Sequence, residues 1–169
     1  MKILVTGATG FIGVSLCKAL VSIPGFNIIG SGRSSMDLEA DNFLFIRIAD
    51  SPSAIEWRNL LEGVDVVIHL AARAHVLSDA SHDPLAEFRK VNVQDTLALA
   101  EQALDAGIKR FVFLSSIGVN GSYTQEHAFT ESNLPAPQAM YAVSKWEAEQ
   151  GLVSLCDKTL MDVVIIRPP

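Results

Sequence analysis

Short β-type runs and longer helical stretches alternate along the chain. Strands are expected at residues 2–6, 27–31, 43–48, 64–70, 110–115 and 162–167, and helices at 11–22, 52–61, 84–106 and 141–157. Two of these strands, 64–70 and 110–115, are almost continuously apolar, which is typical of parallel strands covered on both faces. Six strands with helical crossovers predict an α/β fold built on a doubly wound parallel sheet.

Composition and charge narrow the class of protein. The 169 residues are 49% hydrophobic and 19% charged, as expected of one globular domain, residues 1–169. A net charge of −6 argues against nucleic acid as a partner, because phosphate-backbone binders carry basic surfaces. The chain shows neither an apolar run long enough to cross a membrane nor the N-terminal pattern of a signal peptide, so we expect a cytoplasmic protein without a membrane partner.

Neither cysteine indicates a metal site. Cys17 and Cys156 lack metal-ligand or CxxC spacing, and both stand in apolar helical stretches. We therefore expect buried, reduced thiols and no bound metal.

A glycine-rich turn follows the first expected strand and opens the first helix, with the sequence Gly7-Ala8-Thr9-Gly10-Phe11-Ile12-Gly13. In that context Gly7 permits a tight turn, Gly10 lets the backbone approach a pyrophosphate, and Gly13 lets the helix pack close to the strand. Amides at the helix start then face the anion. No Gly-Lys-Ser/Thr follows, which excludes a P-loop. A purely structural turn is the alternative.

The end of the second expected strand bears on the choice between NAD and NADP. An acidic residue there holds the ribose 2′-hydroxyl of NAD, whereas arginine suits the 2′-phosphate of NADP. Arg33 stands at this point, with no acidic residue before Asp37, which favours NADP; a solvated surface arginine is the alternative. Asp50, after the third strand, is placed either to reach an adenine amino group or to cap the next helix.

Tyr141 and Lys145 stand four residues apart in the last expected helix, so their side chains share one helix face. A free tyrosine has a pKa of about 10, and a nearby ammonium lowers that pKa and makes the phenol a usable proton shuttle. This spacing also arises often by chance. Ser116 adds weight, because it follows the fifth strand at the carboxyl edge of the sheet, where doubly wound folds bind ligands.

Six motifs occur in a fixed order along the chain: residues 6–13, His69-Leu70-Ala71-Ala72, Asn92-Val93, Leu114-Ser115-Ser116, Tyr141-Ala142-Val143-Ser144-Lys145 and Ile166-Arg167-Pro168-Pro169. This series resembles that of the extended short-chain dehydrogenase/reductase family, the NAD-dependent epimerase/dehydratase group. The resemblance covers essentially the whole chain and implies a Rossmann fold. Residues 69–91 and 144–150 further resemble bacterial UDP-sugar 4-epimerase-like and 4-keto-sugar reductase proteins of surface-polysaccharide synthesis.

The resemblance implies roles for the candidate site. Tyr141 is the catalytic acid/base, Lys145 holds the nicotinamide ribose and tunes Tyr141, and Ser116 contacts a substrate oxygen. Asn92 matches a helix asparagine with a structural or a direct role, and Asn120 stands where the epimerases usually have tyrosine. Together with Arg33 and Asp50 from the strand ends, the expected cofactor contacts are Gly7, Thr9, Gly10, Phe11, Ile12, Gly13, Leu70, Ala71, Ala72, Ser115, Tyr141, Lys145 and Pro168.

Three classes of function stay open at this point. The first is a UDP-hexose 4-epimerase-like enzyme that moves a hydride between sugar C4 and NAD or NADP with Tyr141 as acid/base. Its close alternative is an NADPH-dependent 4-keto-sugar reductase, which Arg33 favours. A non-catalytic dinucleotide-sensing protein is the second class, and a scaffolding domain is the third.

The resemblance also bears on assembly. Family members continue beyond the Arg-Pro-Pro, so we expect the C-terminal substrate-binding part to be absent from this chain. Helices 84–106 and 141–157 resemble a pair that forms a homodimer interface in relatives, with Leu97, Ala100, Val143 and Trp146 as the candidate contacts. An ordinary intramolecular core is the alternative.

Overall fold

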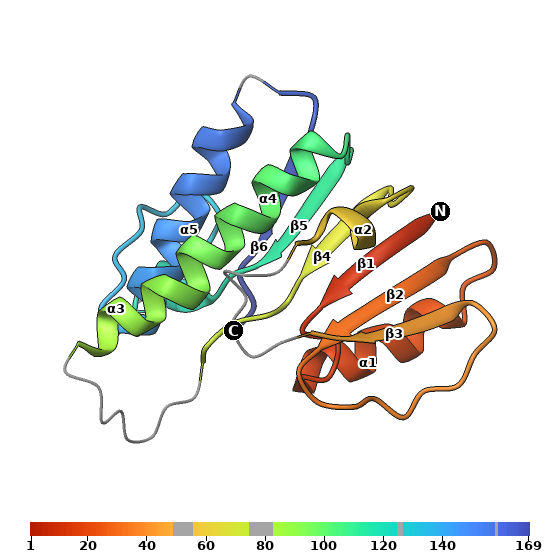
Figure 1. Ribbon diagram of the computed structural model, residues 1–169. Coiled ribbons are helices and arrows are strands. Elements are labelled where there is room, and N and C mark those ends of the chain that lie inside the picture. Colours follow the sequence, from red (N-terminus) through yellow and green to blue (C-terminus); the bar gives the residue numbers. More distant parts are fainter. Residues whose placement is uncertain (49–55, 75–82, 125–126, 158) are drawn as a thin grey trace.

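The computed structural model describes residues 1–48, 56–74, 83–124, 127–157 and 159–169. A parallel sheet with the strand order β3-β2-β1-β4-β5-β6 lies at its centre (Figure 1). The strand order reverses between β1 and β4, and ligands of such sheets bind at that crevice. The doubly wound sheet is therefore confirmed. Its strands are β1 (Lys2–Thr6), β2 (Asn27–Gly32), β3 (Phe43–Arg47), β4 (Val66–His69), β5 (Arg110–Leu114) and β6 (Asp162–Ile166).

The helices pack on both faces of the sheet. They are α1 (Phe11–Val21), α2 (Arg58–Leu61), α3 (Pro84–Arg89), α4 (Asp95–Asp105) and α5 (Met140–Cys156), with a π-helical turn η2 (Lys90–Gln94) and a 3₁₀ turn η3 (Ile117–Val119). Helix α1 covers one face of the β1–β3 half, whereas α4 and α5 cover the other face over β4–β6 (Figure 1).

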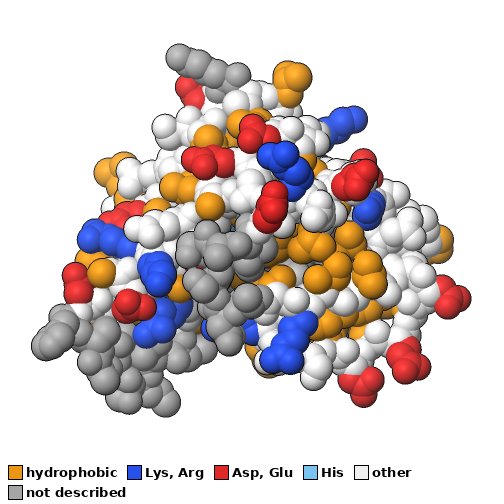
Figure 2. All heavy atoms as spheres, viewed as in Figure 1, with side chains coloured by type: hydrophobic (Ala, Val, Ile, Leu, Met, Phe, Trp, Pro, Cys, Tyr) orange, Lys and Arg blue, Asp and Glu red, His pale blue; other side chains and the backbone are white. Residues whose placement is uncertain are grey.

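Alternation along β1 assigns successive side chains to the two layers. Val5 packs with Cys17 and Leu20 of α1, while Leu4 belongs to the core that α4 and α5 close over the opposite face. Leu44 shares its face with Leu4 by strand register, yet it is 55% exposed. Hydrophobic side chains accordingly gather at the surface over β1–β3 (Figure 2).

Two expected helices differ from the structure. The stretch 84–106 is helical throughout most of its length but is divided by the π-helical turn, in which buried Asn92 bonds to backbone and side chains of other elements. Of the expected helix 52–61, the described residues are helical only from Arg58. The Trp57 amide is bonded to the Gln102 side chain at 2.8 Å, and this tertiary contact fixes the late start. Residues 51–55 lie outside the described residues.

The cysteines are both free, but they differ in burial. Cys17 of α1 is fully buried, as expected. Cys156 is only half-buried because it ends α5, so the expectation of burial is wrong there.

Helices α4 and α5 pack against each other within the chain. Ala100 is fully buried in the chain's own core, so its expected place in a dimer interface is wrong. Leu97 lies against Gly151 of α5, and the Trp146 ring lies 5.7 Å from the Arg167 guanidinium. Within the part of the chain that the structure describes, no helix is long and apolar enough to cross a membrane.

Candidate functional site

The glycine loop closes tightly between β1, α1 and the end of β4. Gly7 has φ +69°, and a Cβ there would lie 2.7 Å from the Ala71 amide nitrogen. A Cβ on Gly13 would lie 2.2 Å from the Gly7 carbonyl oxygen. The loop thus needs glycine at both positions, and it places the Leu70–Ala72 stretch directly beside the start of α1.

The start of α1 presents backbone rather than side chains to a ligand. Gly10 is the N-cap and contributes no side-chain cap, and the first-turn amides of an α-helix have no acceptor within the helix. The Phe11 side chain is 97% exposed, and Ile12 is exposed as well. Their expected role as cofactor contacts stays a prediction, and both their amides and their exposed side chains are available for it.

Thr9 connects the glycine loop to the end of β2. A Cβ on Gly32 would lie 2.7 Å from the Thr9 hydroxyl, so the two residues are in contact. Arg33 follows immediately and is exposed, and its carbonyl accepts a hydrogen bond from Arg47 Nε at 2.9 Å. The structure thus brings Arg33 beside the glycine loop, as the cofactor argument requires. Asp50 lies outside the described residues.

Ser116 lies at the carboxyl edge, between β5 and η3. Its hydroxyl accepts a hydrogen bond from the Gly118 amide at 3.1 Å. The Ile117 amide donates to the Pro168 carbonyl at 2.8 Å, so the segment after β6 lies beside Ser116. A Cβ on Gly118 would lie 3.3 Å from Ala142 Cβ, which places the Ser116 turn against the first turn of α5, next to Tyr141.

Tyr141 and Lys145 are both withdrawn from water. Tyr141 is half-buried with its ring edge-on to Phe88, at 6.3 Å between centroids. Lys145 is 1% exposed, and its Nζ lies 3.9 Å from the centroid of the Phe113 ring. Burial lowers the pKa of Lys145 to about 7, opposed by the charge of Glu149, and burial raises the pKa of Tyr141. The expected lowering of the Tyr141 pKa is therefore not seen, because desolvation of the phenol dominates.

The Ser115 hydroxyl donates a hydrogen bond to Glu149, and its expected contact with the cofactor stays a prediction. Glu149 is paired with Arg167, and Arg167 Nη1 donates to Asn120 Oδ1 at 3.1 Å. Sequence reasoning missed this polar cluster. The available signals were an acid four residues after Lys145 and an arginine after an apolar strand.

Asn92 holds three elements together. Its Oδ1 accepts from the Arg73 amide at 2.8 Å, and its Nδ2 donates to the Arg73 carbonyl at 3.1 Å and to Ser144 Oγ at 2.9 Å. These bonds tie the chain after β4 to α5 beside Lys145. Of the two roles left open for Asn92, the structure shows the structural one.

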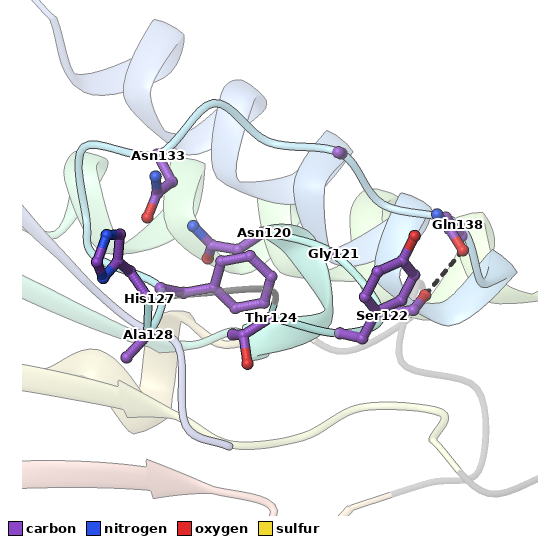
Figure 3. A pocket seen from close by; sticks show the side chains of 11 residues that line it. Asn120, Gly121, Ser122, Thr124, His127, Ala128, Asn133 and Gln138 are labelled. Atoms are coloured by element: carbon purple, nitrogen blue, oxygen red, sulfur yellow. Dashed lines mark hydrogen bonds between the residues drawn. The ribbon is translucent and has the colours of Figure 1, made fainter.

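A pocket of about 320 Å³ opens inside the loop after η3 (Figure 3). Its lining is rich in polar side chains, and Ser122 Oγ donates to Gln138 Oε1 across it at 3.0 Å. Asn120 and Phe129 line both this pocket and a second cavity of about 390 Å³, which reaches Glu149 and Arg167. Among the described residues that line the first pocket, neither Ser116 nor Tyr141 appears, so it lies beside the candidate catalytic residues rather than over them.

Comparison with known proteins decides the family. The model of the NAD dependent epimerase/dehydratase family matches residues 3–169. The chain belongs to this family. This match confirms the membership in the extended short-chain dehydrogenase/reductases that the six motifs indicated.

Several relatives are similar over nearly the whole chain. UDP-glucose 4-epimerase of Vibrio cholerae is 41% identical over 168 residues, which are 99% of this chain and 51% of that protein. N-acetyl-alpha-D-glucosaminyl-diphospho-ditrans,octacis-undecaprenol 4-epimerase of Escherichia coli O157:H7 is 31% identical over 99% of this chain and 48% of that protein. The chain thus spans about half the length of these curated relatives.

Solved structures agree with the fold. UDP-glucuronic acid 4-epimerase from Bacillus cereus, in complex with UDP-glucuronic acid and NAD, superposes with a TM-score of 0.86 and 29% identity. The superposition covers 99% of this chain and 56% of the Bacillus chain. The sheet and helices of this chain therefore have the same arrangement as the matched part of that enzyme.

Proposed function

We propose that this protein interconverts UDP-hexoses at sugar C4, with Tyr141 as the acid/base. The carrying observation is the contact between Gly118 and Ala142, which sets the Ser116 turn against the first turn of α5. Ser116 and Tyr141 then flank one substrate oxygen at the carboxyl edge of the sheet, close to where the strand order reverses. The similarity to nucleotide-sugar 4-epimerases supports this reading.

The glycine loop fits a nicotinamide dinucleotide. A Cβ at Gly7 or Gly13 would collide with backbone, so the loop keeps its close turn, and the first-turn amides of α1 suit a pyrophosphate. Leu70, Ala71 and Ala72 would line the same groove, with Lys145 at the nicotinamide ribose and Pro168 near the ring. When bound, the dinucleotide supplies the hydride acceptor and donor at C4.

The protein's own residues handle the proton. With its pKa raised by burial, Tyr141 is a neutral phenol at pH 7 and can donate a proton to a C4 oxygen. To take a proton from the 4-hydroxyl, it needs the Lys145 ammonium on the same helix face, since opposite charge favours the phenolate. Ser116 would hold the C4 oxygen by a hydrogen bond.

The variant Tyr141→Phe tests this function. With UDP-glucose and NAD, we expect the rate of UDP-galactose formation to fall roughly 10²- to 10⁴-fold, because the proton loses its carrier. NAD should still bind, because the glycine loop is unaltered in this variant. The matched control is Tyr123→Phe, which removes the other tyrosine of the chain. A wild-type rate in Tyr141→Phe would contradict the role of Tyr141 as the acid/base, whereas a wild-type protein that binds NAD but forms no UDP-galactose would favour the dinucleotide-sensing alternative.

Arg33 supports a second candidate, an NADPH-dependent 4-keto-sugar reductase. It is exposed directly after Gly32, the residue of β2 that contacts Thr9, and a 2′-phosphate is expected at this end of the strand. Oxidation of NADPH by a UDP-4-keto-hexose, followed at 340 nm, separates the two activities. An epimerase would return the hydride to the sugar without net oxidation.

A further inference from the structure

A buried ion pair joins four segments around the candidate catalytic residues. Glu149 of α5 accepts from Arg167 Nε at 3.0 and 3.2 Å and from Nη2 at 2.5 Å, and it also accepts the Ser115 hydroxyl. Arg167 reaches on to Asn120, whose Nδ2 donates to the Thr130 carbonyl at 3.2 Å. The ends of β5 and β6 and helix α5 therefore meet at the Glu149 carboxylate, and Arg167 links the loop after η3 to it.

Two of these contacts are adjacent to candidate catalytic residues. Ser115 immediately precedes Ser116, and Glu149 lies one turn after Lys145 and two turns after Tyr141 on α5. A shift of the Glu149 carboxylate would therefore move the Ser116 turn relative to Tyr141. The bidentate geometry of arginine with carboxylate restricts such shifts in direction as well as in distance.

The pair differs from the exposed ion pairs of the same fold. The side chains of Glu149 and Arg167 are 2% and 18% exposed, whereas those of Glu147 and Arg89 are 29% and 47% exposed. Apolar residues of similar size often stabilise a fold as well as a buried pair does. Apolar residues would not, however, reproduce the directional hydrogen bonds between Glu149 and Arg167.

We propose that Glu149, held by Arg167, is a positioning residue that fixes the Ser116 turn against Tyr141 for the reaction. This inference rests on the proposed function. Glu149 contacts neither substrate nor cofactor in this account and acts through Ser115 and through helix α5. Its negative charge also favours the ammonium form of Lys145.

The test replaces the pair without leaving a buried charge. We compare wild type with the double variant that carries Glu149→Met and Arg167→Leu. The control Glu147→Gln removes an acid that pairs with arginine at an exposed site of the same helix. Circular dichroism and thermal unfolding establish that the double variant is folded.

The first measurement determines kcat and KM separately for 4-epimerisation. The folded double variant should lose roughly 10- to 100-fold in kcat, because a misplacement on the ångström scale costs about that much, while NAD affinity is retained. Glu147→Gln should keep the wild-type kcat. Wild-type kcat in the folded double variant would overturn the proposal.

The second measurement does not need activity. In a Tyr123→Phe background Tyr141 is the chain's remaining tyrosine, so absorbance at 295 nm reports its ionisation alone. Loosening the contact of α5 with the Ser116 turn exposes the phenol, and its pKa should fall toward the ordinary value of about 10. An unchanged titration in the folded double variant would overturn the inference. If wild type lacks epimerase activity but the titration moves, the proposed function fails while the positioning role stands.

Discussion

His69 is a buried side chain whose protonation makes the stability of the fold depend on pH. It is buried between β1 and α4, with Nδ1 2.6 Å from Thr6 Oγ1 and Nε2 2.9 Å from Thr96 Oγ1. Its ring stacks on Phe113 at 5.9 Å between centroids, and Lys145 lies over the Phe113 ring as well. Burial, with a smaller contribution from the Lys145 charge, lowers the pKa of His69 to about 3. The folded protein therefore holds a neutral imidazole.

This predicts acid sensitivity in a defined range. The unfolded chain protonates His69 near pH 6.5, whereas the folded chain does so only near pH 3, so the unfolded state binds more protons in between. Stability should fall as pH falls from 6.5 toward 3, by up to roughly 5 kcal/mol from this residue. Urea unfolding at several pH values checks this.

A matched pair of variants isolates the effect. His69→Gln keeps hydrogen-bonding groups for Thr6 and Thr96 but cannot titrate, so its stability should depend less steeply on pH than that of wild type. Exposed His127→Gln serves as the control and should keep the wild-type slope. Equal slopes in all three proteins would refute the account of His69.

At the scale of elements, the turn from β1 into α1 depends on steric exclusion at Gly7. Gly7 and Gly25 both have positive φ, at +69° and +81°. A Cβ on Gly7 meets Ala71 backbone at 2.7 Å, but a Cβ on Gly25 meets nothing within 4 Å. A side chain at Gly25 would therefore meet backbone strain alone, whereas a side chain at Gly7 would meet both backbone strain and a steric clash.

Replacing Gly7 and Gly25 by alanine should lower the free energy of unfolding by different amounts. Gly25→Ala should lose roughly 1–2 kcal/mol for the left-handed conformation alone. Gly7→Ala should lose that amount plus roughly 1–3 kcal/mol, because Ala71 and the end of β4 must move. Denaturant unfolding of both variants measures the difference. Equal losses would show that the close approach of Gly7 to Ala71 contributes nothing.

The sequence could predict those elements whose pattern lies within a few neighbouring residues. The β1–α1 turn is encoded by glycines within seven residues, and the strands by apolar runs, so their positions agree with the structure. The π-helical turn and the late start of α2 follow from contacts of Asn92 and Trp57 with distant residues, which no local pattern contains. The pairing of Glu149 with Arg167 likewise requires knowing how α5 packs against β6.

The candidate site was predicted in the same uneven way. Gly7 lies against Leu70 and Ala71, Thr9 lies against Gly32, and the Ser116 turn meets α5 beside Tyr141. The hydrogen bond of Ser115 to Glu149 was not foreseen, because it joins residues 34 positions apart and appears only in three dimensions. Electrostatics were also beyond the sequence, since burial sets the pKa values of Tyr141 and Lys145.

At the scale of the whole molecule, the sheet places the glycine loop and the candidate catalytic residues on one edge. The glycine loop at β1 lies beside the end of β4, and β5 and β6 bring Ser116 and Pro168 to the neighbouring stretch of that edge. A dinucleotide lying along this edge would reach from Arg33 to Lys145. The family relationship supports that placement, and it makes dinucleotide binding the central claim.

Calorimetric titration of the 169-residue chain with NAD, and in parallel with NADP, tests that claim most directly. We expect one dinucleotide to bind per chain. If Arg33 meets the 2′-phosphate, NADP binds more tightly, and Arg33→Ala weakens NADP binding by about tenfold while leaving NAD binding unchanged. A folded chain that binds neither dinucleotide would contradict the account.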